Sequence, residues 1–296
     1  MSVDKHQVQR QFDRSAEQYD GLSTMQRDIV DVLMAEVPQS LNHAVIENSS
    51  THIENRAKTG GIDTPVICDL GCGTGYALSR LSSIYRRAKL TGLDLAPAML
   101  RAAEQRFSAT QRGSIRANFI QGDIESLPFS PNSVDLCFSS SAIQWCNTEL
   151  AAKQMHAALK PGGSALISSF LAGTLQSWRA LWGKNDQSFL SIVEFERAIS
   201  GSGLVLDRLW AESYIQSFDS FEGALKSVRN LGAGNASGAR PKGLMSRARF
   251  ADITAQVDAI IQQDGVIELN YQVVYAKTTK PRTTKPRTPK SRGTNE

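Results

Sequence analysis

The sequence predicts an α/β protein with a doubly wound, mainly parallel sheet of seven strands, and three observations support this prediction. From residue 64 onwards, apolar runs of strand length alternate with segments of helical periodicity. The first of these strands runs into three alternate glycines, Gly71, Gly73 and Gly75, and the second strand ends at an acid, Asp94. Parallel neighbours need crossover connections, so helices are expected to cover the sheet.

The first 38 residues are predicted to form an N-terminal helical cap. Val8 and Phe12 recur at the spacing of one helix face, and a second apolar series of the same kind ends at Pro38. Residues 39–63 are polar and contain paired glycines, which indicates a loop or a variable insertion.

One domain at 64–277 is expected to hold the sheet. The last strand is expected to be antiparallel, because a helix-free or hairpin-like return reverses the direction of the chain. The segments near 171–200, which is rich in aromatic residues, and near 218–262 are predicted to be cap insertions. The expected strands are 66–70, 90–95, 117–121, 134–139, 163–170, 204–217 and 267–277, and the expected helices among them are 76–86, 97–107, 148–159, 220–231 and 246–262.

Composition points to a reduced, cytoplasmic protein. The chain has 296 residues and 41% hydrophobic content, which allows a full-sized core. No window approaches the length of about 20 apolar residues that spans a membrane, and the polar N-terminus lacks the apolar stretch of a secretory signal. Two cysteines, Cys68 and Cys137, lie in predicted strands, and no histidine cluster completes a metal set. We therefore expect neither a disulfide nor a metal.

The tail at 278–296 accounts for the positive charge of the chain. From Lys277 to Glu296 there are seven basic residues and one acidic, a charge of +6, so a net charge of +4 leaves −2 for the rest. The tail repeats Thr-Lys-Pro-Arg-Thr and has no apolar residue to bury, so we expect it to be disordered. It could bind nucleic acid without sequence preference or be a solubilising extension, and we favour the extension.

The glycine turn predicts a nucleoside cofactor. Alternate glycines let a ligand approach the main chain closely, and an acid such as Asp94 can accept hydrogen bonds from ribose hydroxyls. A dinucleotide site would need a further glycine where this chain has Tyr76. With Asp69 ahead of the glycines, the turn resembles motif I of the class I S-adenosylmethionine-dependent methyltransferases, whose Rossmann-like fold has a seven-stranded sheet. The alternative is a glycine turn in an unrelated α/β sheet.

This resemblance implies that the cofactor is S-adenosylmethionine. The companion motifs follow in the expected order, with Gly122-Asp123-Ile124 after the third strand and Leu159 to Gly163 before the fifth. The residues that the resemblance assigns to the cofactor are Asp69, Gly71, Cys72, Gly73, Gly75, Asp94, Leu95, Met99, Asp123, Ile124 and Ser139.

Three further stretches together resemble the malonyl-[acyl-carrier protein] O-methyltransferases of biotin synthesis: Phe12 to Asp20, Ala142 to Cys146, and Val228 to Ala233. The likeness covers about 8–38 and 64–277. It implies methyl transfer to a malonyl group carried by acyl-carrier protein or by coenzyme A, in an enzyme expected to be a monomer. Position 140 is commonly Asn in that family and is Ser here.

The chemistry implied by this family needs positioning more than acid–base catalysis. A carboxylate is already ionised at neutral pH, because free carboxyl groups titrate near pH 4, so no general base is required. Arg229 is the predicted partner of the carboxylate, since a guanidinium fork can pair with it in a dry pocket. Tyr19, Gln144 and Trp145 complete the predicted catalytic set, as walls or as hydrogen-bonding groups.

Other functions stay open at this point. A different carboxylic acid or a quinone ring could accept the methyl group, and a ring carbon would need a base such as His156. An RNA methyltransferase is disfavoured because the folded body carries a charge of −2 and no basic stripe, so no nucleic acid is expected there. A catalytically silent cofactor-binding protein is a further alternative. A basic rim that steers an acidic carrier protein is expected at Arg240, Lys242, Arg247 and Arg249, although these could be ordinary surface charges.

Overall fold

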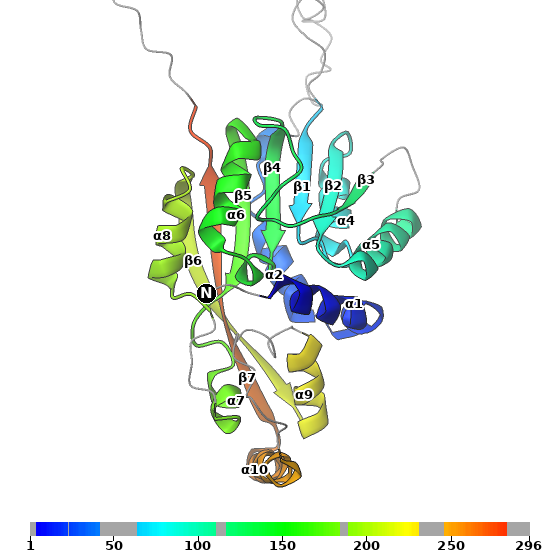
Figure 1. Cartoon of the computed structure of the whole chain (residues 1–296), viewed down its shortest axis with the longest axis vertical. Helices are drawn as coiled ribbons and strands as arrows, with labels where there is room; N and C mark the ends of the chain where they lie inside the picture. Colours follow the sequence, from blue (N-terminus) through cyan, green and yellow to red (C-terminus); the bar gives the residue numbers. More distant parts are fainter. Residues whose placement is uncertain are drawn as a thin grey trace, which may run out of the picture.

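The computed structural model describes residues 4–22, 24–41, 64–110, 117–183, 189–230 and 246–282. In Figure 1 one twisted sheet runs along the molecule, with helices packed on both of its faces. The predicted insertion at 39–63 lies almost entirely outside the described residues, apart from a short turn at 39–41.

The sheet has seven strands in the order β3-β2-β1-β4-β5-β7-β6. Strand β7 runs antiparallel to its neighbours β5 and β6, and the other pairs are parallel, which confirms the predicted mainly parallel sheet with a reversed last strand. The strands are β1 (Val66–Leu70), β2 (Lys89–Asp94), β3 (Ala117–Gln121), β4 (Val134–Ser140), β5 (Leu159–Phe170), β6 (Val205–Phe218) and β7 (Ile267–Thr279).

Two helical layers cover the sheet. Helices α2 and α4 pack on one face, while α6 and α8 pack on the other, and α1 lies across the carboxyl-terminal edge of the parallel strands (Figure 1). The helices are α1 (Lys5–Leu22), α2 (Thr24–Met34), α4 (Tyr76–Ile84), α5 (Pro97–Thr110), α6 (Thr148–Ala158), α7 (Gln176–Leu181), α8 (Ile192–Ser200), α9 (Phe221–Asn230) and α10 (Arg247–Asp264), with a short 3₁₀ helix η2 (Ile143–Trp145) after β4.

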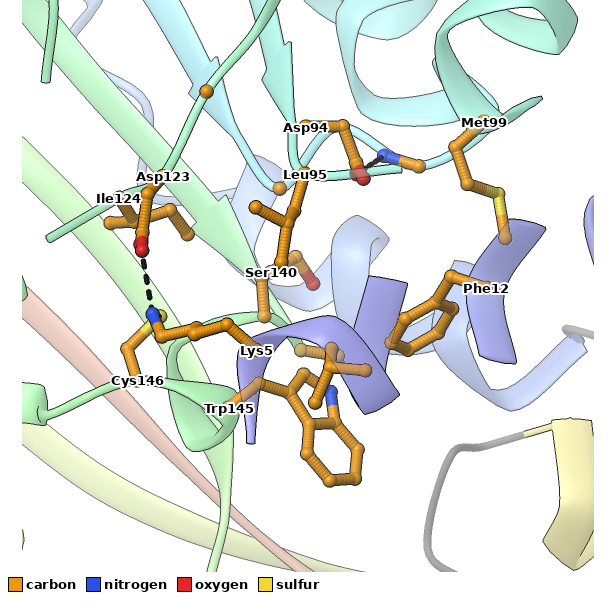
Figure 2. Close-up of a pocket in the computed structure, with 16 residues that line it drawn as sticks. Lys5, Phe12, Asp94, Leu95, Met99, Asp123, Ile124, Ser140, Trp145 and Cys146 are labelled. Carbon is orange, nitrogen blue, oxygen red and sulfur yellow. Dashed lines mark hydrogen bonds and ion pairs between the residues drawn. The ribbon is translucent and has the colours of Figure 1, made fainter. Parts of the chain in front are cut away.

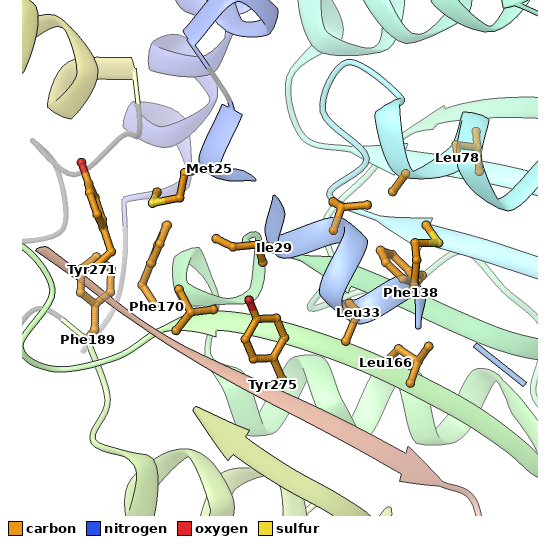
Figure 3. Close-up of a cluster of buried hydrophobic side chains, with 14 of the residues drawn as sticks. Met25, Ile29, Leu33, Leu78, Phe138, Leu166, Phe170, Phe189, Tyr271 and Tyr275 are labelled. Carbon is orange, nitrogen blue, oxygen red and sulfur yellow. The ribbon is translucent and has the colours of Figure 1, made fainter. Parts of the chain in front are cut away.

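Helix α2 belongs to the main hydrophobic core. Met25, Ile29 and Leu33 recur every four residues and are all buried, so they form one apolar stripe. This stripe packs on the sheet against Phe138 and Leu166, as Figure 3 shows. Full burial of such a side chain contributes about 1.5–3 kcal/mol, so the predicted N-terminal cap is anchored through α2.

The predicted cap segment near 171–200 divides into two parts. Helix α8 begins with a capping box between Ser191 and Glu194 and buries Phe195 and Ile199 in the core beneath α6, so it covers the sheet as a crossover helix. Helix α7 instead joins an aromatic cluster with α9 and α10. The rings of this cluster are Trp178, Trp182, Phe221 and Phe250, with centroids 5.6–6.4 Å apart.

The sheet extends into the start of the predicted tail. Strand β7 continues to Thr279, and Lys280 donates its backbone N–H to Gly163 and accepts one from Gly162 at 2.8 Å each. A boundary at 278 was therefore too early, because antiparallel pairing with β5 holds Thr278, Thr279 and Lys280. Residues 283–296 lie outside the described residues, and no described helix is long and apolar enough to cross a membrane.

Candidate functional site

The glycine turn between β1 and α4 is held against the end of β2. The backbone N–H groups of Gly71 and Cys72 both donate to the carbonyl of Leu93, at 2.7 and 3.0 Å. Gly71 has a φ of +74°, and a Cβ atom added there would lie 2.3 Å from the Cβ atom of Ala142. Gly73 also has a positive φ, of +50°, but the space in front of it is open. The turn therefore brings bare backbone to the edge of a cavity.

Two pockets meet at this turn and share Gly71, Gly73, Ser140 and Ser141 as lining residues. The first pocket, of about 630 Å³ and partly open to solvent, lies between α1, the ends of β2 and β3, and the turn after β4 (Figure 2). The second pocket, of about 470 Å³, lies between α2 and the start of α4. An elongated ligand could occupy both and cross the glycine turn.

Asp94 ends β2 at the wall of the first pocket. Its Oδ2 atom accepts the backbone N–H of Gly73 and its Oδ1 atom accepts that of Ala96, both at 2.9 Å. Burial raises the pKa of Asp94, while the backbone N–H groups of Ala96, Gly73 and Leu95 oppose that rise. Each oxygen keeps a second lone pair, so the carboxylate can still accept hydrogen bonds from a ribose diol.

Asp69 is the buried acid of the second pocket. It is 2% exposed, and its Oδ2 atom has no hydrogen-bond partner among the described residues. Burial, and then the charge of Asp94, raises the pKa of Asp69 to about 8. Arg27 lines the same pocket, with its guanidinium 5.4 Å from the centroid of the Tyr76 ring. An acid and a guanidinium in one pocket fit the amino and carboxylate groups of the methionine half of S-adenosylmethionine.

The raised pKa of Asp69 predicts that the affinity for S-adenosylhomocysteine increases from pH 6 to about pH 8. We expect the ligand's ammonium group to bind the ionised carboxylate, so below a pKa of about 8 protonation of Asp69 should weaken binding by up to tenfold per pH unit. Calorimetric titration across this range measures the slope. The Asp69→Asn variant, which cannot ionise, should show a flat profile, and an equally steep profile would contradict the assignment.

The far wall of the first pocket is suited to a purine. Leu95, Met99 and Ile124 are apolar, and Asp123 lies beside Ile124, as Figure 2 shows. The Oδ1 atom of Asp123 accepts the backbone N–H of Glu125 at 2.9 Å, which leaves Oδ2 as an acceptor for an exocyclic amino group.

Lys5 reaches the same wall from helix α1. Its ammonium group lies 2.8 Å from Asp123, 2.7 Å from Glu125 and 3.7 Å from the Cys146 sulfur. Asp123, Glu125 and Cys146 are close enough together to offer ligand atoms to a metal ion, but the Lys5 ammonium group already lies against all three. Burial lowers the pKa of Lys5, but Cys146 and the two acids raise it by more.

The turn after β4 presents unpaired polar atoms to the first pocket. Ser141 is a non-glycine residue with a φ of +53°, and its buried hydroxyl has no partner among the described residues. The buried indole N–H of Trp145 is likewise unpaired there. Gln144 donates its side-chain amide to the carbonyl of Ser141 at 2.6 Å, so it holds the turn and does not line the pocket. Backbone strain of this kind is often found at functional sites.

Two residues assigned to the cofactor from the sequence lie outside both pockets. Ser139 is fully buried and donates its hydroxyl to the carbonyl of Leu70 at 2.8 Å inside the sheet. Gly75 faces α5, where an added Cβ atom would lie 3.0 Å from that of Ala103, so it allows close helix packing. Ser140, which replaces the family's Asn, shares a hydrogen bond of 3.0 Å with the hydroxyl of Ser168 and lines both pockets.

Of the predicted catalytic residues whose side chains are described, Arg229 and Gln144 do not line the first pocket, whereas Trp145 does. Arg229 lies in the last turn of α9 with an exposed side chain, and its carbonyl accepts the side-chain amide of Gln11 at 2.7 Å. A buried arginine clamp is therefore not present, because this face of α9 points to solvent. Tyr19 lies in α1, but its side chain is outside the described residues.

Sequence reasoning did not assign Lys5, Arg27 or Ser141 to the site. Lys5 and Arg27 lie in helices whose apolar pattern indicates only which face is buried, and the acids and the ring that they interact with lie in loops or helices far away in the sequence. The run Ser139-Ser140-Ser141 was a usable signal, but which serine faces the pocket depends on the left-handed backbone at Ser141.

Most of the residues that line the two pockets lie in a segment that matches a known protein family. A methyltransferase domain family matches residues 67–163, which run from β1 into β5. The malonyl-[acyl-carrier protein] O-methyltransferase of Halorhodospira halophila is 30% identical over 281 residues, which cover 93% of this chain and 87% of that protein. The biotin biosynthesis bifunctional protein BioHC of Teredinibacter turnerae is 29% identical over 95% of this chain, which spans 48% of that longer protein.

Among solved structures, a chain in the Haloferax volcanii complex of the Trm112 methyltransferase activator shares the fold. Its TM-score is 0.56 at 17% identity, over 92% of this chain and 98% of that chain. At this identity the likeness supports the Rossmann-like methyltransferase fold alone.

Proposed function

Because the chain belongs to the family of malonyl-[acyl-carrier protein] O-methyltransferases, we propose that it transfers the methyl group of S-adenosylmethionine to the free carboxylate of a malonyl thioester. The product is a methyl ester that enters biotin synthesis, the pathway named for one relative. The thioester is carried by acyl-carrier protein in the relatives' names, and we propose the same carrier here.

The lining of the first pocket carries this proposal. The described residues that line it include no histidine and two acids, Asp94 and Asp123. Both acids accept backbone N–H groups, and Asp123 is also paired with Lys5. A malonate carboxylate needs no general base, because it is ionised at neutral pH. The described groups can therefore perform this reaction by binding and orientation.

A quinone-ring acceptor is less well supported. His156, the base that a ring carbon would need, lies on α6 against Gly203, which comes just before β6. Since β6 is parallel to β5, Gly203 is at the amino-terminal edge of the sheet, away from the pocket at the carboxyl ends. Burial, and then the charge of Lys280, lowers the pKa of His156. His156 is nevertheless too far from the pocket to act as the base.

The cofactor supplies an electrophilic methyl group, and the chain must hold the acceptor about 3 Å from it in line with the sulfur. We propose that the unpaired Trp145 N–H and Ser141 hydroxyl donate hydrogen bonds to the malonyl carboxylate, because a desolvated charge has to be paired. Phe12 and Phe189 pack edge-on against Trp145, at 6.1 and 6.3 Å, and exclude water from this side.

The exposed position of Arg229 predicts a role in substrate entry. An exposed ion pair contributes at most about 1 kcal/mol, so Arg229→Ala should raise KM for the malonyl substrate about fivefold and leave kcat within twofold. Steady-state kinetics measure both, and Arg87→Ala, an exposed arginine near the other edge of the sheet, serves as the control. A loss of kcat of more than about hundredfold would instead mean that Arg229 closes over the carboxylate as the buried clamp.

The function itself is tested with methyl-labelled S-adenosylmethionine. Malonyl, succinyl and acetyl thioesters, each on acyl-carrier protein and on coenzyme A, are incubated with the purified enzyme. We expect label in a carboxyl methyl ester of the malonyl substrate and none with acetyl, which lacks a free carboxylate. Absence of malonyl labelling by an enzyme that binds the cofactor would reject the proposal.

A further inference from the structure

We propose that Lys5 is a positioning residue whose ion pairs with Asp123 and Glu125 latch helix α1 across the cofactor pocket and slow the release of the demethylated cofactor. The inference concerns cofactor exchange, so it stands or falls independently of the malonyl acceptor. It assigns a function to the first turn of α1, a segment that no glycine or acid motif marks.

The Lys5 ammonium group bridges two carboxylates. The Lys5 ammonium group lies 2.8 Å from Asp123 Oδ1, a pair shown in Figure 2, and 2.7 Å from Glu125 Oε1. Both acids come from the loop after β3. The exposed fractions of the Lys5, Asp123 and Glu125 side chains are 25%, 32% and 21%. Without Lys5, the Asp123 and Glu125 carboxylates would face each other with no cation between them, and their like charges would repel.

Helix α1 forms one wall of the pocket. Lys5, Val8 and Phe12 are spaced as one helix face and all line it. Further along α1, Asp13 accepts the backbone N–H of Ala98 in the first turn of α5 at 2.9 Å. Lys5 is therefore an ionic attachment near the amino-terminal end of the helix, while Asp13 holds the helix nearer its middle. Loss of the Lys5 pairs should let the first turns open without detaching the whole helix.

The latch also orients a cofactor-facing acid. Asp123 Oδ1 accepts both the Lys5 ammonium group and the Glu125 backbone N–H, so the carboxylate is fixed with Oδ2 available to the pocket. If Oδ2 accepts the adenine amino group, the same ion pair that closes α1 also positions the hydrogen-bond acceptor.

The test measures the dissociation rate of S-adenosylhomocysteine by stopped-flow tryptophan fluorescence, because Trp145 lines the pocket. Lys5→Met should release the ligand about fivefold to tenfold faster, with association changed less than twofold. Lys5→Arg should restore the rate to within twofold. The control is Lys153→Met, which removes an exposed Lys153–Glu149 pair on α6 and should change nothing.

Ionic strength and a second variant separate a latch from a general structural role. Raising salt should accelerate release from the wild type towards the Lys5→Met rate and leave that variant unaffected. Glu125→Gln can still accept the backbone N–H of Asn147. As a single variant it should accelerate release, but added to Lys5→Met it should cause no further acceleration. An unchanged release rate in both single variants, or additive and salt-independent effects, would overturn the proposal. If the release rates change as expected but malonyl thioesters are not methylated, only the proposed acceptor would be rejected.

Discussion

Gly71→Ala is expected to lower the affinity for S-adenosylhomocysteine by more than about hundredfold, a change of about 2.7 kcal/mol. The added Cβ atom would lie 2.3 Å from the Ala142 Cβ atom, whereas carbon atoms in contact are about 3.5–4.0 Å apart. The backbone at Gly71 also has a φ of +74°, which costs an L-residue about 1–2 kcal/mol. To avoid this contact, either the glycine turn has to break its hydrogen bonds to Leu93, or the turn after β4 has to move. Either movement disrupts both pockets.

Gly183→Ala is the matched control for this substitution. Gly183 has a similar φ of +67°, but an added Cβ atom meets nothing within 4 Å. The control should lose about 1–2 kcal/mol of folding free energy and bind the ligand as the wild type does. Calorimetric titration and thermal unfolding measure the two quantities. Equal affinities for Gly71→Ala and Gly183→Ala would show that the close approach to Ala142 does not shape the cofactor site.

Asp94→Ala should weaken cofactor binding by at least tenfold. The carboxylate is placed to accept hydrogen bonds from the ribose hydroxyls, and charge-assisted hydrogen bonds contribute about 1.5–3 kcal/mol each. The same oxygens accept the backbone N–H groups of Gly73 and Ala96, so the substitution also loosens the glycine turn. Asp94→Asn should fall between wild type and alanine, because the amide keeps one acceptor oxygen and loses the charge.

The control for Asp94 is Asp135→Ala at the other end of the sheet. Asp135 also accepts a backbone N–H at 2.9 Å, from Val66, and pairs with Lys160, but it lines neither pocket. This variant should lose stability and keep its affinity for the cofactor. An Asp94→Ala variant that binds S-adenosylhomocysteine with unchanged affinity in calorimetry would remove Asp94 from the cofactor site.

The strands themselves and the cofactor half of the predicted site follow from local sequence. Strand residues, the glycine turn and the acid that ends β2 are fixed by chain spacing of a few residues, and parallel pairing then brings Asp69, Asp94 and Asp123 to one edge of the sheet. The antiparallel last strand was also predicted correctly, although two helices, α9 and α10, lie between β6 and β7 in the chain.

The acceptor side and the closure of the pocket were decided by tertiary structure. Lys5 meets Asp123 across 118 residues, and no short-range pattern encodes that meeting. Ser139, Ser140 and Ser141 are three consecutive serines with different surroundings. The first is buried in the sheet, and the second forms a hydrogen bond with Ser168 of β5. The third lies at the pocket because its backbone is left-handed. The sequence by itself indicated a nucleoside cofactor, and its motifs resembled a family that uses S-adenosylmethionine, because the backbone turn and the strand ends that carry these motifs are local. Only the folded chain decided which side chains close over the cofactor, because their placement depends on packing between distant segments.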